Sequence, residues 1–130
     1  RDQFLDETFN YMASYFENSL QELENRNADL TARFKRIDGN SFTAVIYQNG
    51  DAISRCKIRL GGALGNGISY SANDHADDTS FNENLSVEFD DQHMFLRPLG
   101  MAMGMAQKDK NLSAEGASEY YWSMLIQRLQ

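Results

Sequence analysis

Basic side chains recur at every second position in two short segments of the chain. The first segment places Arg33 and Lys35 among apolar residues, and the second does the same with Arg55, Lys57 and Arg59. Alternate residues of a β-strand project from one face, so this spacing gathers positive charge on one side of each strand. Guanidinium and ammonium groups held in this way can bind phosphate or carboxylate groups. The first chemistry that the sequence offers is therefore the binding of an anion.

Two predicted hairpins make the basic segments neighbours in one sheet. Asn49-Gly50 is typical of a two-residue hairpin loop and would place Ala44 opposite Arg55. A first turn centred on Gly39-Asn40 would place Lys35 opposite the same Ala44. Because directly opposed residues share a face, the cations of both segments are predicted to lie together. The predicted basic face holds Arg33, Lys35, Arg55, Lys57 and Arg59, with Ile37, Phe42, Ala44, Ile46 and Ile53 among them.

The other face of these strands is predicted to be the core, covered by two helices. Its members would be Leu30, Ala32, Phe34, Val45, Tyr47, Cys56, Ile58 and Leu60. In a final hairpin, the same pairing logic separates a polar set from an apolar set. The polar set is Glu88, His93, Phe95 and Arg97, and the apolar set is Leu85, Val87, Met94 and Leu96.

Phe42 is the aromatic residue predicted to lie among the cations, where its ring could stack a nucleotide base. Two alternatives stay open. In the first, the cations form a solvated face that pairs with acidic residues and deters edge-to-edge aggregation. In the second, the face docks onto another domain or subunit through its apolar residues. The ligand-binding residues predicted here are Arg33, Lys35, Phe42, Arg55, Lys57 and Arg59.

Hydrophobic periodicity defines the elements that would position this face. Apolar residues recur every three or four positions from Leu5 to Leu23, which predicts an amphipathic helix. Ser113 is a good N-cap for a last helix, with Glu115 in its first turn. Between the helices, the pattern alternates as in half-buried strands. The sequence predicts an α+β fold: an antiparallel β-meander of about six strands, near residues 30–35, 42–47, 52–60, 68–71, 85–90 and 93–97, with both helices packed on one face.

Length, charge and cysteine content limit the classes of function. The 130 residues fit one domain, residues 1–130, and a first residue other than Met indicates a fragment of a larger protein. The net charge of −7 argues against nucleic acid and membrane partners, although residues 30–60 alone carry six cations and two acids. Cys56 is the only cysteine and no apolar run is long enough to span a membrane, so a cytoplasmic location is expected.

Other candidate sites lack the spacing that their chemistry needs. Residues 73–84 are rich in oxygen ligands that calcium would accept, but they lack the EF-hand pattern, so a solvated acidic loop is preferred. The glycines of residues 61–67 lie between strands rather than before a helix, which argues against a phosphate loop. Residues 101–105 carry three methionines that would close one end of the core or line a groove. We predict no catalytic residue, metal or cofactor.

Several segments together resemble a known region of other proteins. They are residues 42–47 (FTAVIY) with the following Asn49-Gly50, residues 81–87 (FNENLSV), residues 98–101 (PLGM) and residues 121–126 (YWSMLI). They are similar to a region beside the Toll/interleukin-1 receptor (TIR) domain in some bacterial TIR-containing proteins. The resemblance implies an accessory domain that senses or assembles, with NAD cleavage belonging to a TIR domain that this chain does not contain. It implies no residue roles.

The function that the sequence favours is a non-catalytic binding module of a larger intracellular protein. Its ligand would be an anionic small molecule such as a nucleotide, held on the basic face. One alternative is an oligomerisation or protein-interaction domain, with a second copy or a neighbouring domain as partner. Another is a small enzyme, whose acids and bases would be residues such as Glu83, His75 and His93 gathered in a pocket.

Overall fold

The computed structural model describes residues 2–61, 66–75, 81–100 and 111–129. It has the predicted α+β fold, with a helix at each end and an antiparallel sheet between them. The elements in chain order are α1 (Asp2–Arg26), β1 (Leu30–Asp38), β2 (Ser41–Gln48), β3 (Asp51–Leu60), β4 (Gly67–Ser71), β5 (Glu83–Phe89), β6 (Met94–Pro98), α2 (Ala114–Ile126) and a short 3₁₀ helix, η2 (Gln127–Leu129).

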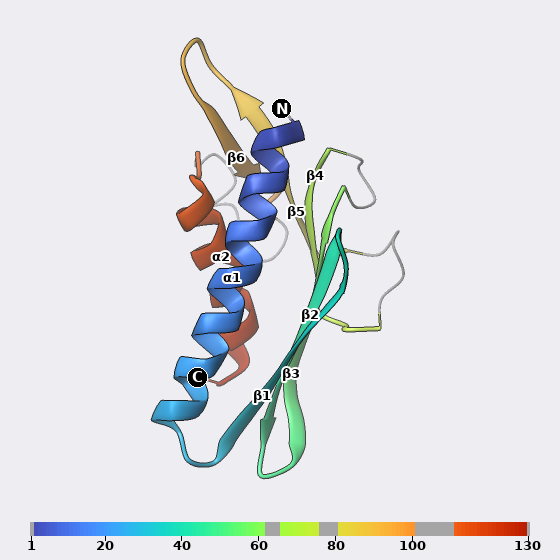
Figure 1. Cartoon of the computed structure of the whole chain (residues 1–130), viewed down its shortest axis with the longest axis vertical. Coiled ribbons are helices and arrows are strands. Elements are labelled where there is room, and N and C mark those ends of the chain that lie inside the picture. Colours follow the sequence, from blue (N-terminus) through green and yellow to red (C-terminus); the bar gives the residue numbers. More distant parts are fainter. Residues whose placement is uncertain (1, 62–65, 76–80, 101–110, 130) are drawn as a thin grey trace.

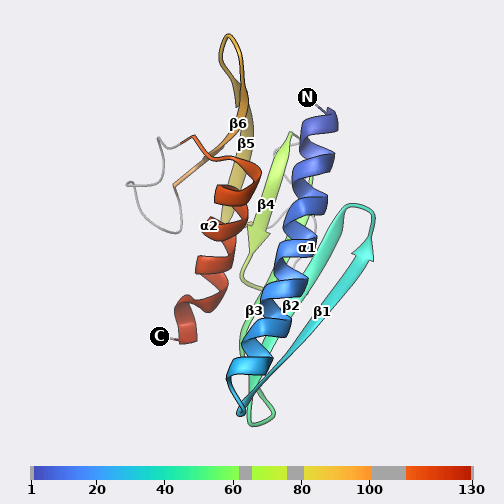
Figure 2. The same cartoon turned by 60° about the vertical axis from the view of Figure 1, so that its left-hand side comes forward.

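The sheet is a six-stranded meander in which every strand pairs with its neighbours in sequence. Both helices lie side by side on one face, as Figure 1 shows. The view of Figure 2 separates them: α1 runs past the β1–β3 part of the sheet, while α2 lies toward the β5–β6 side and contacts both β3 and β6. Among the described residues, no helix lies on the opposite face of the sheet, which is called the open face below.

The core forms where the apolar stripe of α1 meets the sheet. Phe9 and Phe16 of α1 pack against Phe42 of β2, with ring centroids 5.6 Å and 5.3 Å apart. Phe16 also meets Trp122 of α2 edge to face, which joins the two helices. These rings are large apolar surfaces whose burial stabilises the fold by about 1.5–3 kcal/mol per fully buried side chain. The stripe predicted for the first helix is therefore confirmed, since Leu5, Phe9, Met12, Phe16 and Leu20 are all buried.

The register of the sheet differs from the predicted one at two places. Asn49 and Gly50 do form the two-residue hairpin loop, with positive φ angles of 51° and 90°. However, Ile46 pairs with Ser54 while Tyr47 pairs with Ala52, so β3 contains one extra residue. A second irregularity lies at the end of β1, between Arg36 and Asp38. Each bulge shifts the pairing by one residue, and one residue is enough to exchange the two faces of a strand.

With these two bulges, the side chains of β1 and β3 lie largely on the faces predicted for them. The side chains of β2 lie on the faces opposite to those predicted. Val45, not Ala44, lies opposite Arg55, and Thr43 lies opposite Lys57. The placement of Phe42 on the basic face was therefore wrong, because its ring is fully buried against the helices. The same correction moves Ala44, Ile46 and Ile53 to the helix-covered face and Val45 and Tyr47 to the open face.

Candidate functional site

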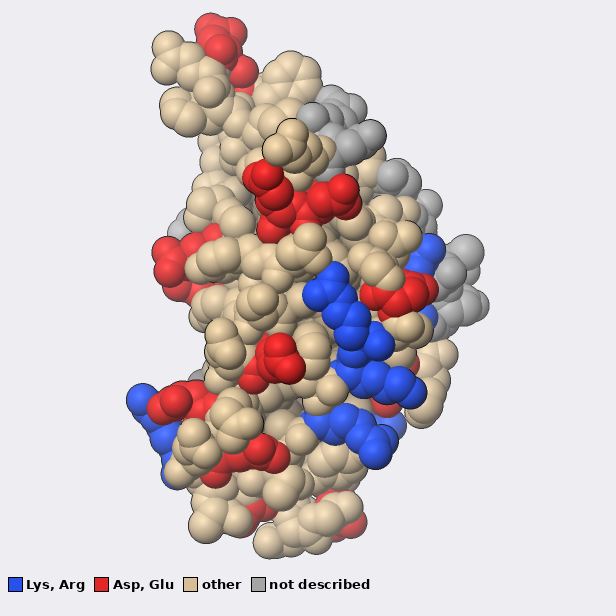
Figure 3. Space-filling view, viewed as in Figure 1, with Lys and Arg blue, Asp and Glu red and all other residues tan. Residues whose placement is uncertain are grey.

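The five predicted cations lie together on the open face. The register places Arg33 and Arg55 on either side of Val45, and Lys35 and Lys57 on either side of Thr43. Arg59 extends the β3 row, opposite Ser41. Neighbouring strands are about 4.8 Å apart, so the β1 and β3 rows run roughly 10 Å from each other. Figure 3 shows a band of Lys and Arg over this part of the sheet, with an acidic group against its edge and further acidic residues elsewhere on the visible face.

Small hydroxyl residues flank the cations of β3. Lys57 stands between Thr43 and Ser71, and Arg59 stands between Ser41 and Ser69. These four hydroxyl residues are buried, with at most 7% of their surface exposed. Two of the hydroxyls already donate hydrogen bonds within the chain, Ser41 to Asp38 Oδ1 at 3.2 Å and Ser69 to the Arg59 carbonyl at 3.5 Å. The cations are therefore the donors of this surface that suit an oxyanion.

Tyr47 takes the position that the sequence had suggested for Phe42. It pairs with Thr31 and Ala52 and lies two residues along β2 from Val45, on the open face beside the two arginines. Its ring is partly exposed, and the open face therefore has an aromatic group within the basic region. The sequence offered no signal for this placement, because the β-bulge that turns Tyr47 outward has no characteristic residue pattern here.

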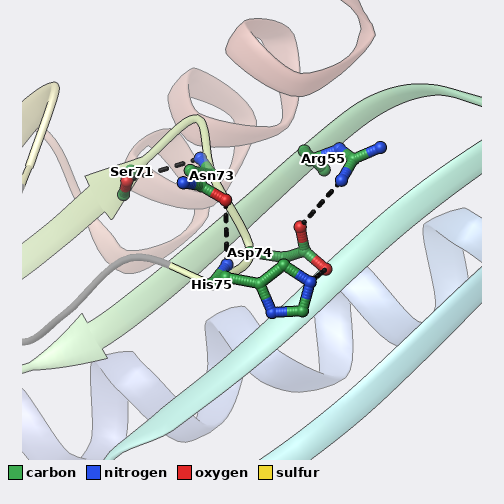
Figure 4. Close-up of polar contacts among 5 residues, drawn as sticks. All are labelled: Arg55, Ser71, Asn73, Asp74 and His75. Carbon is green, nitrogen blue, oxygen red and sulfur yellow. Dashed lines mark hydrogen bonds and ion pairs between the residues drawn. The ribbon is translucent and has the colours of Figure 1, made fainter.

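An acidic side chain already lies beside one cation of this face. Asp74 Oδ1 is 3.4 Å from Arg55 Nη1, and Asp74 Oδ2 is 3.7 Å from His75 Nε2 (Figure 4). The loop that carries Asp74 is fixed by Asn73, whose Oδ1 accepts a hydrogen bond from the His75 backbone N–H at 3.0 Å. Within the described part of the chain, Arg33 and Lys35 form no salt bridge. Arg55 thus differs from Arg33 and Lys35 in having an acidic partner on this face.

Arg55 also lines a cavity of about 340 Å³ at the edge of β3. The cavity exists because β4 pairs with β3 only from Lys57 to Leu60. Beside the first half of β3 lie the end of β4, the residue Asn82 before β5, and η2. Arg128 of η2 lines the same cavity, so two arginines that are distant in sequence contribute to one site.

Tyr70 lines this cavity, and the buried thiol of Cys56 lies beside the Tyr70 side chain in the core. Burial raises the pKa of the Tyr70 hydroxyl, and Cys56 contributes to the same shift, whereas the charge of Arg128 acts against it. Burial likewise raises the pKa of the Cys56 thiol. A buried thiol that stays protonated is a poor nucleophile, so Cys56 is a core residue here.

The other residues considered as acids, bases or ligands do not form a common site. Glu83 is fully buried on the helix-covered face, while Glu88 lies on the open face next to Phe95. His75 and His93 have side chains that are 82% and 74% exposed, each beside an aspartate of its own loop. No three potential ligands gather as a metal site would require among the described residues. The methionines of residues 101–105 and much of the acidic loop lie outside that part.

A second cavity, of about 460 Å³, lies where α1 ends and η2 begins. Leu23, Trp122 and Ile126 make most of its wall apolar, and Asp29 at its edge accepts a hydrogen bond from Gln48 Nε2 at 2.8 Å. Arg128 is the one cation along this wall. The smaller cavity, with two cations, is thus the better anion site.

In the part of the chain that the structure describes, no helix combines the length and hydrophobicity needed to cross a membrane.

The site and fold together define a class: an α+β domain with an open, basic sheet face and no assembled catalytic group among its described residues. Comparison with known proteins gives the family. The chain belongs to the Y4lF protein domain family, whose model matches residues 31–127.

A relative from Sinorhizobium fredii (strain NBRC 101917 / NGR234), described as "Uncharacterized protein y4lF", is 47% identical over 131 residues. The match includes all of this chain but only 41% of the relative, so the chain spans less than half of that protein. No solved structure matches. Neither the family nor the relative is described in terms of a TIR domain, and the association with one stays a prediction.

Proposed function

We propose that this domain is a non-catalytic module that binds an anionic small molecule, such as a nucleotide, on its open sheet face. One observation carries the proposal: Arg33, Lys35, Arg55, Lys57 and Arg59 come to one face over three adjacent strands. The molecule as a whole has a net charge of −7, so this concentration of cations runs against its general composition. Clustered cations with a nearby aromatic ring, here Tyr47, suit a phosphate attached to a base.

Thermal denaturation with a panel of small molecules tests this function. Inorganic phosphate, AMP, ATP and citrate are expected to raise the melting temperature, and uncharged adenosine is expected to do much less. Stabilisation follows from mass action, because a ligand that binds only the folded state favours it. No shift with any of the anions would contradict the proposal.

A pair of charge reversals locates the effect on the molecule. Lys57→Glu places a negative charge in the middle of the basic face, between Thr43 and Ser71. Arg26→Glu makes the same change in net charge on α1, where the side chain is 75% exposed. We expect the first variant to lose the stabilisation by anions and the second to keep it. Equal responses would show that anions act on overall charge and not on this face.

A second function, in which the open face docks onto a neighbouring domain or another copy, has weaker support. Of the apolar residues once expected on this face, Phe42, Ala44 and Ile46 belong to the core. What remains beside the cations is mostly hydroxyl residues, which favours a small polar ligand over an apolar partner surface.

A further inference from the structure

A notch lies beside the first half of β3, at the point where the pairing of β3 with β4 has ended. Strand β4 ends at Ser71, and η2 contacts β3. The cavity of about 340 Å³ between them is lined by Arg55 from the sheet and Arg128 from η2. Arg55 is the cation of the basic face that lines this notch, which is therefore where that face meets an enclosed space.

We infer that this cavity binds the phosphate group of a small phosphomonoester, held between Arg55 and Arg128. This inference rests on the proposed anion-binding function, and it places the strongest contact with the anion in this cavity. Two guanidinium groups match the charge of a phosphate dianion, and each presents paired N–H donors to two oxygens. A single-charged carboxylate would use only part of this capacity.

Amide side chains complete the polar lining. Asn82 and Gln127 both line the cavity, and the Asn82 amide is oriented by its Oδ1, which accepts a hydrogen bond from the Ala72 backbone N–H at 2.7 Å. Ser54 is already engaged, since its hydroxyl donates to the Leu125 carbonyl at 2.5 Å. The amides are therefore the neutral groups that can supplement the two arginines.

The dimensions of the cavity limit the ligand that carries the phosphate. Ligand pockets commonly measure about 300–1,000 Å³, so this one lies near the lower end. Met124 and Ala72 make part of its wall apolar, which suits a short carbon skeleton. A compact phosphomonoester fits such a space better than a dinucleotide does.

Asp74 acts as an internal competitor for Arg55. Its carboxylate lies 3.4 Å from the guanidinium, and its side chain is only 14% exposed. The Arg55 side chain remains 40% exposed, so a ligand can approach it from the cavity. Removing the carboxylate charge with the isosteric change Asp74→Asn should leave Arg55 more available to phosphate.

Isothermal titration with inorganic phosphate, with sulfate as a second tetrahedral dianion and acetate as a carboxylate, tests the inference. We expect Arg128→Gln to raise the Kd for phosphate at least tenfold, Arg128→Lys to raise it less, and Asp74→Asn to lower it several-fold. Arg33→Gln, on the same face but outside the cavity, should raise the Kd less than Arg128→Gln does. The matched control is Arg26→Gln on α1, outside the basic face, which should change the Kd less than twofold. Unchanged melting temperatures without ligand will confirm that the variants fold.

The results of this titration distinguish a phosphate site in the cavity from anion binding by the basic face as a whole. If Arg33→Gln weakens phosphate binding as much as Arg128→Gln, or if Arg128→Gln has no effect, the cavity is not the phosphate site, although the face still binds anions. If phosphate does not bind but ATP does, and Lys57→Glu abolishes that binding, the cavity inference fails and the basic face stands. If no anion binds the unaltered protein, both fail.

Discussion

Glu83 is a buried carboxylate that receives hydrogen bonds from three separate parts of the chain. Its oxygens accept from the backbone N–H groups of Asn84, Leu99 and Gly100 at 2.9, 3.1 and 3.1 Å, and from the Tyr120 hydroxyl of α2. A buried acidic side chain is tolerated only when hydrogen-bond donors satisfy its oxygens, and these donors do so. Glu83 therefore ties the start of β5 to the chain after β6 and to α2, which is a structural role and not an acid–base one.

Substitution of Glu83 measures how much this arrangement stabilises the fold. Glu83→Ala would leave several buried donors without an acceptor, and we expect it to lower the free energy of unfolding by about 3–5 kcal/mol. Tyr120→Phe removes only one donor and should cost about 1–2 kcal/mol. Urea denaturation followed by tryptophan fluorescence gives both values, with Glu88→Ala on the open face as control. A Glu83→Ala loss no larger than that of the control would contradict the role.

At the scale of elements, local sequence patterns correctly predicted the features that depend on local interactions. The helices, the number of strands and the Asn49-Gly50 loop follow from periodicity and turn chemistry, and the structure confirms them. The faces of β2 did not follow, because a β-bulge depends on how whole strands pack against the helices. Phe42 fills the space between Phe9 and Phe16. The bulge in β3 allows β2 to direct Phe42 toward the helices while the cations of β3 stay on the open face.

The N-terminus of α2 allows a direct test of one local signal. The Ser113 hydroxyl accepts a hydrogen bond from the Gly116 backbone N–H at 3.1 Å, so the predicted N-cap is confirmed. Ser113→Ala removes that acceptor, and we expect a loss of about 1 kcal/mol in the free energy of unfolding. Ser113→Asp keeps an acceptor and adds a charge that the helix dipole favours, so it should retain the stability. Equal losses for both variants would mean that the cap contributes little.

At the scale of the whole molecule, the cavity at Arg55 and Arg128 shows where sequence reasoning ends. Arg55 was predicted from its alternation with apolar residues on a strand. Arg128 follows an apolar helix and carries no spacing that connects it with the sheet. Their meeting depends on the early end of β4 and on the position of η2 beside β3, both of which are set by the packing of the entire chain.

The reactivity of Cys56 measures how cooperatively the packed core of the domain opens. It is fully buried in the core, it is the only cysteine of the chain, and burial raises the pKa of its thiol. Because only an exposed thiolate reacts readily, modification by a disulfide reagent such as DTNB requires the core to open. We expect the folded protein to react at least about 1,000-fold more slowly than the urea-unfolded chain, as a stability of ~5 kcal/mol implies. The labelled fraction should also rise over the same urea range in which the Trp122 fluorescence changes. Rapid labelling in native buffer would show instead that β3 separates from the helices while the rest of the domain stays folded.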